Sequence, residues 1–459
     1  MNMDLNTSLM LVFATSILLY FISGSKSKLY FLYFLSYVPF VTLNSDAGGL
    51  ENEAGLSGTI VIMKMSVRLA TSSGFMLAFI FSKKSASYLA KPQYLPVVFF
   101  VCWAMLSLHR AQVPWISFFR LGELFTFFLI GLTLYNKVSH KLPVRKVVRW
   151  HCMALSPLCA VAGLFVLINP DIAQHTGEDG SMRIGHQLMN ANVLAFAAVV
   201  TCLWGMFELK EGRERIRGPF FERFVPAFAL CGAFIVVIFA RSRTSSITLF
   251  LGMFLMWVVF TREKRKYLSL VLVGIILATF FAVANFDTFA TWFMRGDDAE
   301  TLKSGTGRTD LWHMLITEQA PKYPMLGSGY LMLSEHGRFE HHGAYWNNAH
   351  NTFIFALVAT GIPGMLAVFS IVLWPMYRAF RMIGRVSEED RGSWVFLFIL
   401  QIVVAVTSIT GFGVSGHPNV AMLFHYALFS YVVTAPAPEK PRPRLGEVEP
   451  AGELAAQTS

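Results

Sequence analysis

The sequence predicts an all-α fold: a polytopic bundle of about 12–14 transmembrane helices with one large, partly helical loop on the outer side of the membrane. Three observations predict it: the composition, a series of apolar runs of spanning length, and a regular alternation of basic and non-basic loops. The chain has 459 residues, of which 54% are hydrophobic and only 14% are charged.

This composition excludes an ordinary soluble protein, because soluble domains carry roughly a quarter of charged residues. The net charge of +10 is compatible with nucleic-acid binding. The basic residues, however, are distributed among alternate loops, so we expect no nucleic-acid partner. The five cysteines show no spacing typical of a metal site, and we expect neither a metal nor another cofactor.

Thirteen runs come close to the roughly 20 apolar residues that a spanning helix requires. They lie near residues 9–23, 29–43, 59–81, 94–108, 115–135, 147–168, 190–208, 224–240, 243–260, 267–286, 351–377, 393–413 and 419–434. The two runs within 224–260 also fit one broken hairpin.

The orientation follows from the basic residues, which accumulate in cytoplasmic loops. Alternate loops, starting with residues 24–28, hold 26 of the 38 Lys and Arg residues, whereas the intervening loops hold nine. This alternation predicts that the N-terminus lies outside and the C-terminus in the cytoplasm.

Four segments follow from these patterns. Residues 1–286 form spans one to ten, and residues 351–434 form the final spans. Residues 287–350 form the large outer loop, whose stretch TDLWHMLITEQA predicts a helix. Residues 435–459 are rich in Pro, Ala and charge, which predicts a disordered cytoplasmic tail.

Charged side chains inside spans are costly and often functional. Arg120 and Glu123 lie one helical turn apart and can form a structural ion pair. Lys64 and Arg68 also share a helix face. A transporter that uses these four charges is an alternative function, although the sequence shows no inverted repeat.

The outer boundaries of the spans collect a second group of polar residues. Arg241 and Arg243 lie in FARSRTSS, where cations are not needed for topology and suit phosphate binding. Arg308 precedes a helix that Thr309 or Asp310 can cap. Further candidates at these boundaries are Arg183, Asn192, His350 and Asn351. The glycines of PMLGSGY give a weak phosphate-loop signal.

Taken in order, SRTSS, GRTDLW, PMLGSGY and AHNTFIFALVATGIPG resemble the O-antigen ligase/polysaccharide polymerase family over roughly residues 180–420. The resemblance carries catalytic roles to Arg243, Arg308 and His350. Substrate binding is expected at Arg183, Arg241, Asn351, Trp312 and Asn192. The first span, which starts outside, departs from the family's usual twelve-span plan.

The resemblance implies glycosyl transfer from an undecaprenyl-diphosphate-linked glycan at the periplasmic face of the bacterial inner membrane. The acceptor is another lipid-linked repeat unit in a polymerase, or lipid A-core in a ligase. Flippase and chain-length regulator proteins are further expected partners.

Arginines would then hold the diphosphate, and His350 would accept the acceptor's proton in an inverting displacement. Aromatic residues of the loop would stack on sugars, namely Trp292, Trp312, Tyr330, Tyr345 and Trp346. We favour a polymerase because GRTDLW and PMLGSGY look more like exopolysaccharide polymerases. A sensor or scaffold with a ligand-binding loop is a further alternative.

Overall fold

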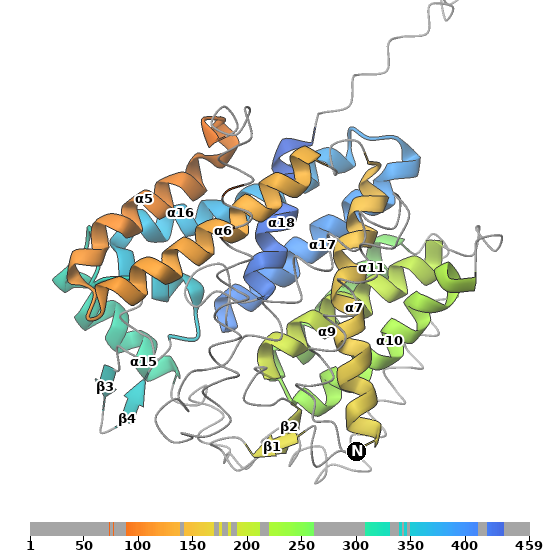
Figure 1. Cartoon of the computed structure of the whole chain (residues 1–459), viewed down its shortest axis with the longest axis horizontal. Coiled ribbons are helices and arrows are strands. Elements are labelled where there is room, and N and C mark those ends of the chain that lie inside the picture. Colours follow the sequence, from red (N-terminus) through yellow and green to blue (C-terminus); the bar gives the residue numbers. More distant parts are fainter. Residues whose placement is uncertain are drawn as a thin grey trace, which may run out of the picture.

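The computed structural model is almost entirely helical (Figure 1). It describes residues 73, 77, 89–137, 142–168, 174–176, 182–184, 191–211, 220–260, 308–330, 339–341, 344–346, 349–411 and 420–435, and the structural statements below concern these residues. The α-helices are α5 (Leu95–Ser107), α6 (Pro114–Lys137), α7 (Val144–Ile168), α9 (Ala191–Glu211), α10 (Phe220–Ala240), α11 (Arg243–Phe260), α15 (Arg308–Met314), α16 (Thr352–Ile383), α17 (Glu388–Thr410) and α18 (Val420–Thr434).

Short elements complete this part of the chain. The single turns are η2 (Pro92–Tyr94), η3 (Leu108–Arg110), the π-helical η6 (Leu315–Gln319) and η7 (Ala320–Lys322). Two antiparallel pairs of three-residue strands are present, β1 (Gln174–Thr176) with β2 (Met182–Ile184), and β3 (Phe339–His341) with β4 (Ala344–Trp346).

Seven helices in the described residues are long and apolar enough to cross a membrane, and Pro226–Ala240 and Ala421–Thr434 are shorter apolar helices. These nine coincide with nine predicted runs, so the polytopic helical bundle is confirmed. The runs near 9–23, 29–43 and 267–286, and nearly all of 59–81, lie outside the described residues. Helices α10 and α11 are two separate helices joined at residues 241–242; both pack on α9, and α11 also packs on α17.

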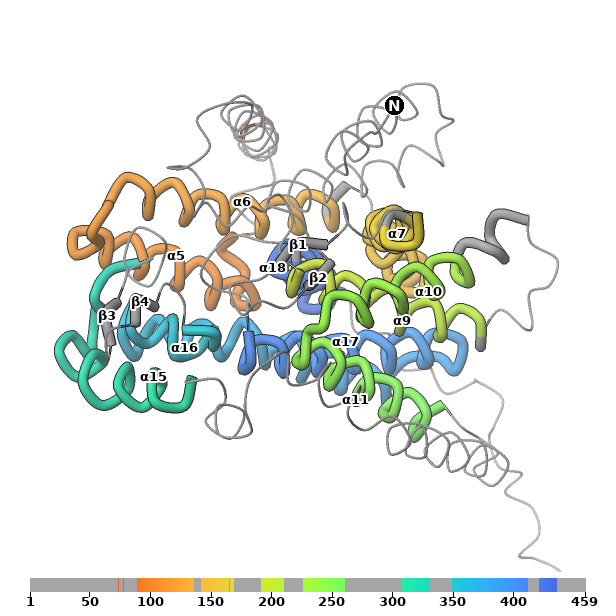
Figure 2. The backbone as a smooth tube through the Cα atoms, turned by 90° about the horizontal axis from the view of Figure 1, so that it is seen from below, coloured from red at the N-terminus to blue at the C-terminus, as the bar shows by residue number. Residues whose placement is uncertain are grey.

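The helices form two groups around α17 and α18 (Figures 1 and 2). In one group, α5 packs on α16 and α6 packs on α18. In the other group, α9 packs on α7, α10 and α11. Helices α16 and α11 both contact α17, which joins the two groups.

The helix ends that the basic loops predict to be cytoplasmic lie together. Arg145 of α7 and Glu208 of α9 form an ion pair of 3.4 Å at this end. Arg378 near the end of α16 donates to the carbonyl of Ala435, directly after α18, at 3.0 Å. The helix directions therefore agree with the predicted alternation from α5 onward.

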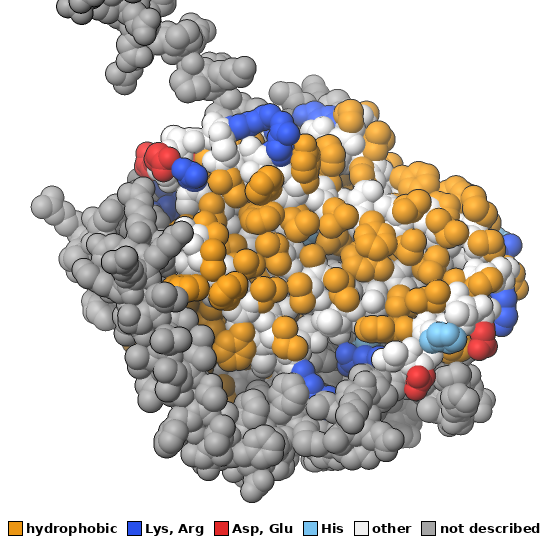
Figure 3. Space-filling view, turned by 180° about the vertical axis from the view of Figure 1, so that it is seen from behind, with side chains coloured by type: hydrophobic (Ala, Val, Ile, Leu, Met, Phe, Trp, Pro, Cys, Tyr) orange, Lys and Arg blue, Asp and Glu red, His pale blue; other side chains and the backbone are white. Residues whose placement is uncertain are grey.

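Hydrophobic side chains cover a broad face of the molecule, and charged side chains lie around the margins of this face (Figure 3). Phe228 of α10, Phe250 of α11 and Leu366 of α16 are each more than half exposed. A surface of this kind is stable where lipid tails replace water. Inside it, Arg120 and Glu123 form the predicted ion pair at 2.8 Å; Lys64 and Arg68 lie outside the described residues.

Helix α16 is broken near its outer end. Gly361 has φ 74° and ψ −174°, which interrupts the helical hydrogen bonds. The amides of Ser328 and Gly329 donate to the carbonyls of Val358 and Ala359 at 2.7 and 3.2 Å. The large loop is thereby attached to the bundle at the break.

This attachment overturns the phosphate-loop interpretation of PMLGSGY. The backbone groups that would cradle a phosphate are already paired with α16, and the amide of Ile362 donates to Pro324 in return at 2.8 Å. Arg110 and Ser117, at the turn between α5 and α6, donate to the carbonyls of Gly327 and Tyr330 at 3.3 and 2.7 Å. The segment is a structural clamp, defined here as residues 324–330.

Substitutions of Gly329, in the clamp, and of Gly361, at the break in α16, test this role. We expect Gly361→Ala and Gly329→Ala to destabilise the protein by about 2 kcal/mol or more, because both glycines have positive φ and an added Cβ would meet backbone atoms of Met325 and Ala111. Gly122→Ala is the control, since its Cβ would meet nothing within 4 Å. Thermal unfolding in detergent measures the effect; equal midpoints for all three variants would contradict it.

Candidate functional site

A small open cavity lies among the ends of the helices that the sequence predicts to be outside. Its walls come from α9, α11, α17, α18, the first residue of α15 and the residue before Asn351. The lining residues are Asn192, Val193, Phe196, Ser242, Thr244, Ser245, Arg308, His350, Thr407, Thr410, Gly411 and Ala421. None of the lining residues in this described part of the chain is acidic.

Four long helices begin at this cavity. Their first residues are Ala191 of α9, Arg243 of α11, Thr352 of α16 and Val420 of α18, each within two residues of a lining residue. A helix N-terminus carries roughly half a positive charge and amide groups without helical partners. The dipoles of these helices favour an anion in the cavity, although Asn351 and Ser242 already accept from amides at the starts of α16 and α11.

The two-residue turn between α10 and α11 provides part of this wall. Ser242 is the N-cap of α11, because its Oγ accepts from the amide of Ser245 at 3.4 Å. Arg241 adopts a left-handed conformation, φ 47°, and Arg243 is the first helical residue. Cations at a helix N-terminus are unfavourable by themselves, so two arginines here favour a bound anion.

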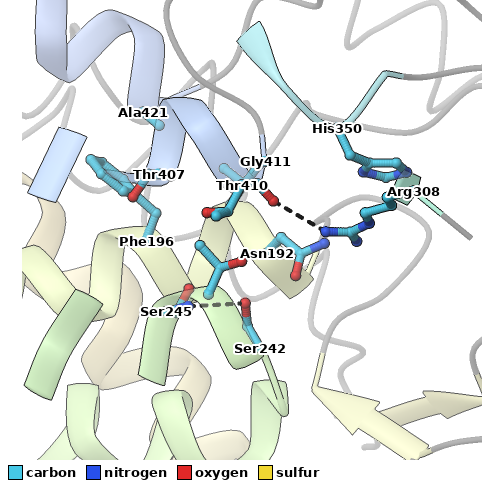
Figure 4. A pocket seen from close by; sticks show the side chains of 12 residues that line it. Asn192, Phe196, Ser242, Ser245, Arg308, His350, Thr407, Thr410, Gly411 and Ala421 are labelled. Atoms are coloured by element: carbon cyan, nitrogen blue, oxygen red, sulfur yellow. Dashed lines mark hydrogen bonds between the residues drawn. The ribbon is translucent and has the colours of Figure 1, made fainter. Parts of the chain in front are cut away.

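Arg308 reaches the cavity from the opposite direction (Figure 4). It is the first residue of α15, and its Nη1 donates to the carbonyl of Thr410 at the end of α17, at 3.2 Å. This bond fixes the guanidinium beside His350, where Figure 4 shows the two side chains next to each other.

His350 lies at the junction of the loop and α16. Its φ is 48°, and Arg241 is the only other non-glycine residue with positive φ in the described part of the chain. Such conformations cost about 1–3 kcal/mol and cluster at functional sites. Burial, and then the positive charge of Arg308, lower the pKa of His350 to about 3. The imidazole is therefore neutral at physiological pH, and in the empty cavity it is a weaker base than a free histidine, because burial and the charge of Arg308 disfavour its protonation.

The residues on either side of His350 are held in place. The indole nitrogen of Trp312 donates to the carbonyl of Ala349 at 2.7 Å. The side-chain oxygen of Asn351 accepts from the amides of Phe353 and Ile354 at 2.9 and 3.1 Å, which caps α16. Both side chains thus position His350, and their expected sugar contacts stay predictions.

The cavity brings together three of the predicted site residues, Arg308, His350 and Asn192. Arg243 does not line it, although its neighbours Ser242 and Thr244 do. Arg241 follows α10 and is half-buried. The backbone of Arg183 pairs with His175 in β1–β2, and its side chain lies outside what the structure describes, as do those of Trp292, Tyr345 and Trp346.

Two details of the loop differ from expectation. Thr309 and Asp310 lie inside α15, which begins at Arg308, so neither is its cap. Tyr330 is fully buried, with its ring against those of Phe100 and Phe355, so the prediction that it stacks on sugar is wrong. Tyr330 is the last residue of the clamp, and its ring packs in the core.

Sequence reasoning missed the wall formed by the end of α17. Thr407, Thr410 and Gly411 line the cavity opposite α11. A signal was present, since two threonines three residues apart share a helix face at the outer end of a span. Ser242, Thr244 and Ser245 belong to the recognised SRTSS motif, but only its arginine had been assigned a role.

One comparison with known proteins found a match. Residues 227–369 match the family model described as O-Antigen ligase. This range contains the α10–α11 turn, Arg308, the clamp and His350. No curated protein matches the chain. Over this segment the chain is similar to the O-antigen ligase family, and its long apolar helices are those of a multi-pass membrane protein.

Proposed function

We propose that this protein transfers a glycan from an undecaprenyl-diphosphate carrier to a sugar hydroxyl, and that it polymerises repeat units of an exopolysaccharide or O-antigen. The O-antigen ligase family supports glycosyl transfer with lipid-linked glycan and lipid A-core substrates. We further propose that the cavity faces the periplasm from the bacterial inner membrane.

One observation carries the proposal: Arg308 and His350 line one cavity, and four helices begin within two residues of its lining residues. The cationic groups suit a diphosphate, and the neutral imidazole beside them suits an acceptor hydroxyl. An anionic carrier whose lipid tail remains in the bilayer would meet these groups at the membrane surface.

The proposed step is a single displacement. The acceptor oxygen attacks the anomeric carbon of the donor sugar, the bond from that carbon to the diphosphate oxygen breaks, and His350 takes the acceptor's proton. The diphosphate leaves on its carrier, stabilised by Arg308 and the arginines at the start of α11. The anomeric configuration inverts, and no step requires a metal.

Ligation to lipid A-core is the second candidate, because the matching family model is described as O-Antigen ligase. The lipid-linked glycans of a strain lacking the protein distinguish the two. A polymerase predicts that single repeat units accumulate. Long lipid-linked chains in that strain would instead establish the ligase.

Arginine variants test the anion site. We expect Arg308→Ala to lower kcat by about 10²–10³, as for loss of one group that stabilises developing negative charge. Arg243→Ala should also reduce product formation strongly. The control is Arg391→Ala, since Arg391 pairs with Glu388 on the exposed surface at the other end of the bundle. Polymer formation in proteoliposomes measures the effect, and full activity of Arg308→Ala would exclude its role.

The left-handed backbone at residue 350 determines which variant tests the proposed base. Alanine there should cost about 1 kcal/mol of stability, whereas asparagine tolerates this conformation. We therefore expect His350→Asn to insert and fold like the wild type and to form no polymer. Turnover near the wild-type rate in this variant would remove the general-base role.

The protonation state of His350 can be measured without turnover. A lowered pKa in the folded protein disfavours the charged imidazole, so the ring should remain neutral as the pH falls through the usual histidine value of about 6.5. NMR of histidine-labelled protein in micelles would follow the signal that disappears in His350→Asn. A titration midpoint of 6.5 or above would contradict the burial described here.

Trp312→Phe tests the positioning of His350. This change removes the hydrogen bond to Ala349 and retains most of the ring. We expect kcat to fall by about tenfold with little change in KM, because the base is displaced while the anion site persists. Trp115→Phe is the control at a highly exposed position in α6. Equal kinetics of the two variants would show that Trp312 does not act through His350.

A further inference from the structure

The wall of the cavity formed by the end of α17 offers hydrogen-bond acceptors. The hydroxyl of Thr407 donates to the carbonyl of Val403 at 2.8 Å, and that of Thr410 to Val406 at 2.9 Å. A hydroxyl has one hydrogen, which each threonine has already used. Both oxygens can therefore only accept hydrogen bonds from a molecule in the cavity.

The backbone of this wall has the same polarity. Helix α17 ends at Thr410, so its last carbonyls have no partner within the helix and the negative end of its dipole is directed at the cavity. One of these carbonyls, that of Thr410, accepts a hydrogen bond from Arg308. A phosphate oxygen would be repelled by such a wall, whereas a neutral molecule with several hydroxyl groups would donate to it.

The other walls contain the cavity's donors, which are the guanidinium of Arg308, the amide nitrogen of Asn192 and the nearby helix N-termini. In Figure 4 Thr407 lies on the far side of the cavity from His350, with Thr410 and Arg308 between them. The cavity is thus divided into a donor side that suits an anion and an acceptor side that suits sugar hydroxyls.

We propose that the end of α17 is a saccharide subsite, in which Thr407 and Thr410 accept hydrogen bonds from the sugar attached directly to the diphosphate. This inference rests on the proposed function. It assigns specificity for the carbohydrate to α17 and affinity for the diphosphate to the start of α11 and to Arg308. The two threonines hold the donor sugar from the side of the cavity opposite His350.

The test compares two ligands on the full-length protein in lipid nanodiscs. One is the lipid-linked repeat unit isolated from a strain that lacks the protein, and the other is undecaprenyl diphosphate, which has no sugar. Thr407→Val combined with Thr410→Val removes both hydroxyls at nearly constant volume. We expect this double variant to bind the lipid-linked repeat unit about tenfold more weakly and undecaprenyl diphosphate unchanged.

Ser370→Ala is the matched control, because Ser370 makes the same kind of bond to Leu366 on an exposed part of α16. It should bind both ligands like the wild type. Unchanged affinity of the double threonine variant for the glycan, or equal weakening for both ligands, would overturn the subsite. A different result would refute the proposed function itself: Arg308→Ala would then bind undecaprenyl diphosphate as tightly as the wild type does.

Discussion

The arrangement depends on positive electrostatic potential concentrated at the outer end of a membrane bundle. Four helices begin around one cavity, and Arg308 adds a full charge that the end of α17 holds in place. In a partly buried site these dipoles and charges are weakly screened, so they favour an anion strongly. The neutral state of His350 follows from the same potential, because burial and Arg308 both disfavour its protonation.

The break in α16 allows the outer loop to build this site. In a continuous helix the carbonyl of Val358 would pair with the amide of Ile362, and the clamp at residues 324–330 would lose its bonds with both groups. With the clamp in place, Trp312 reaches Ala349 and Arg308 reaches Thr410. The strained backbone of His350 is stabilised by bonds on both sides, through Trp312 and through the cap at Asn351.

The periodicity of apolar residues is sufficient to predict the nine described apolar helices, of which seven are long enough to span a membrane. Arg308, His350 and Asn192 were also identified from the sequence, as polar residues at outer boundaries. The wall at Thr407 and Thr410 was not, because its character depends on which hydroxyl hydrogens the helix itself uses. The clamp was misinterpreted for a related reason: glycine spacing indicates backbone freedom but does not specify the carbonyls that the freed amides meet.

The central claim is that the cavity binds a lipid-linked diphosphate. The most direct measurement is a cryo-electron microscopy structure of the protein in nanodiscs with undecaprenyl diphosphate. The account predicts diphosphate density in the cavity, within hydrogen-bonding distance of the Arg308 guanidinium and of amides at the start of α11, with the lipid tail extending into the bilayer. Ordered diphosphate at any other place, with this cavity empty, would contradict it.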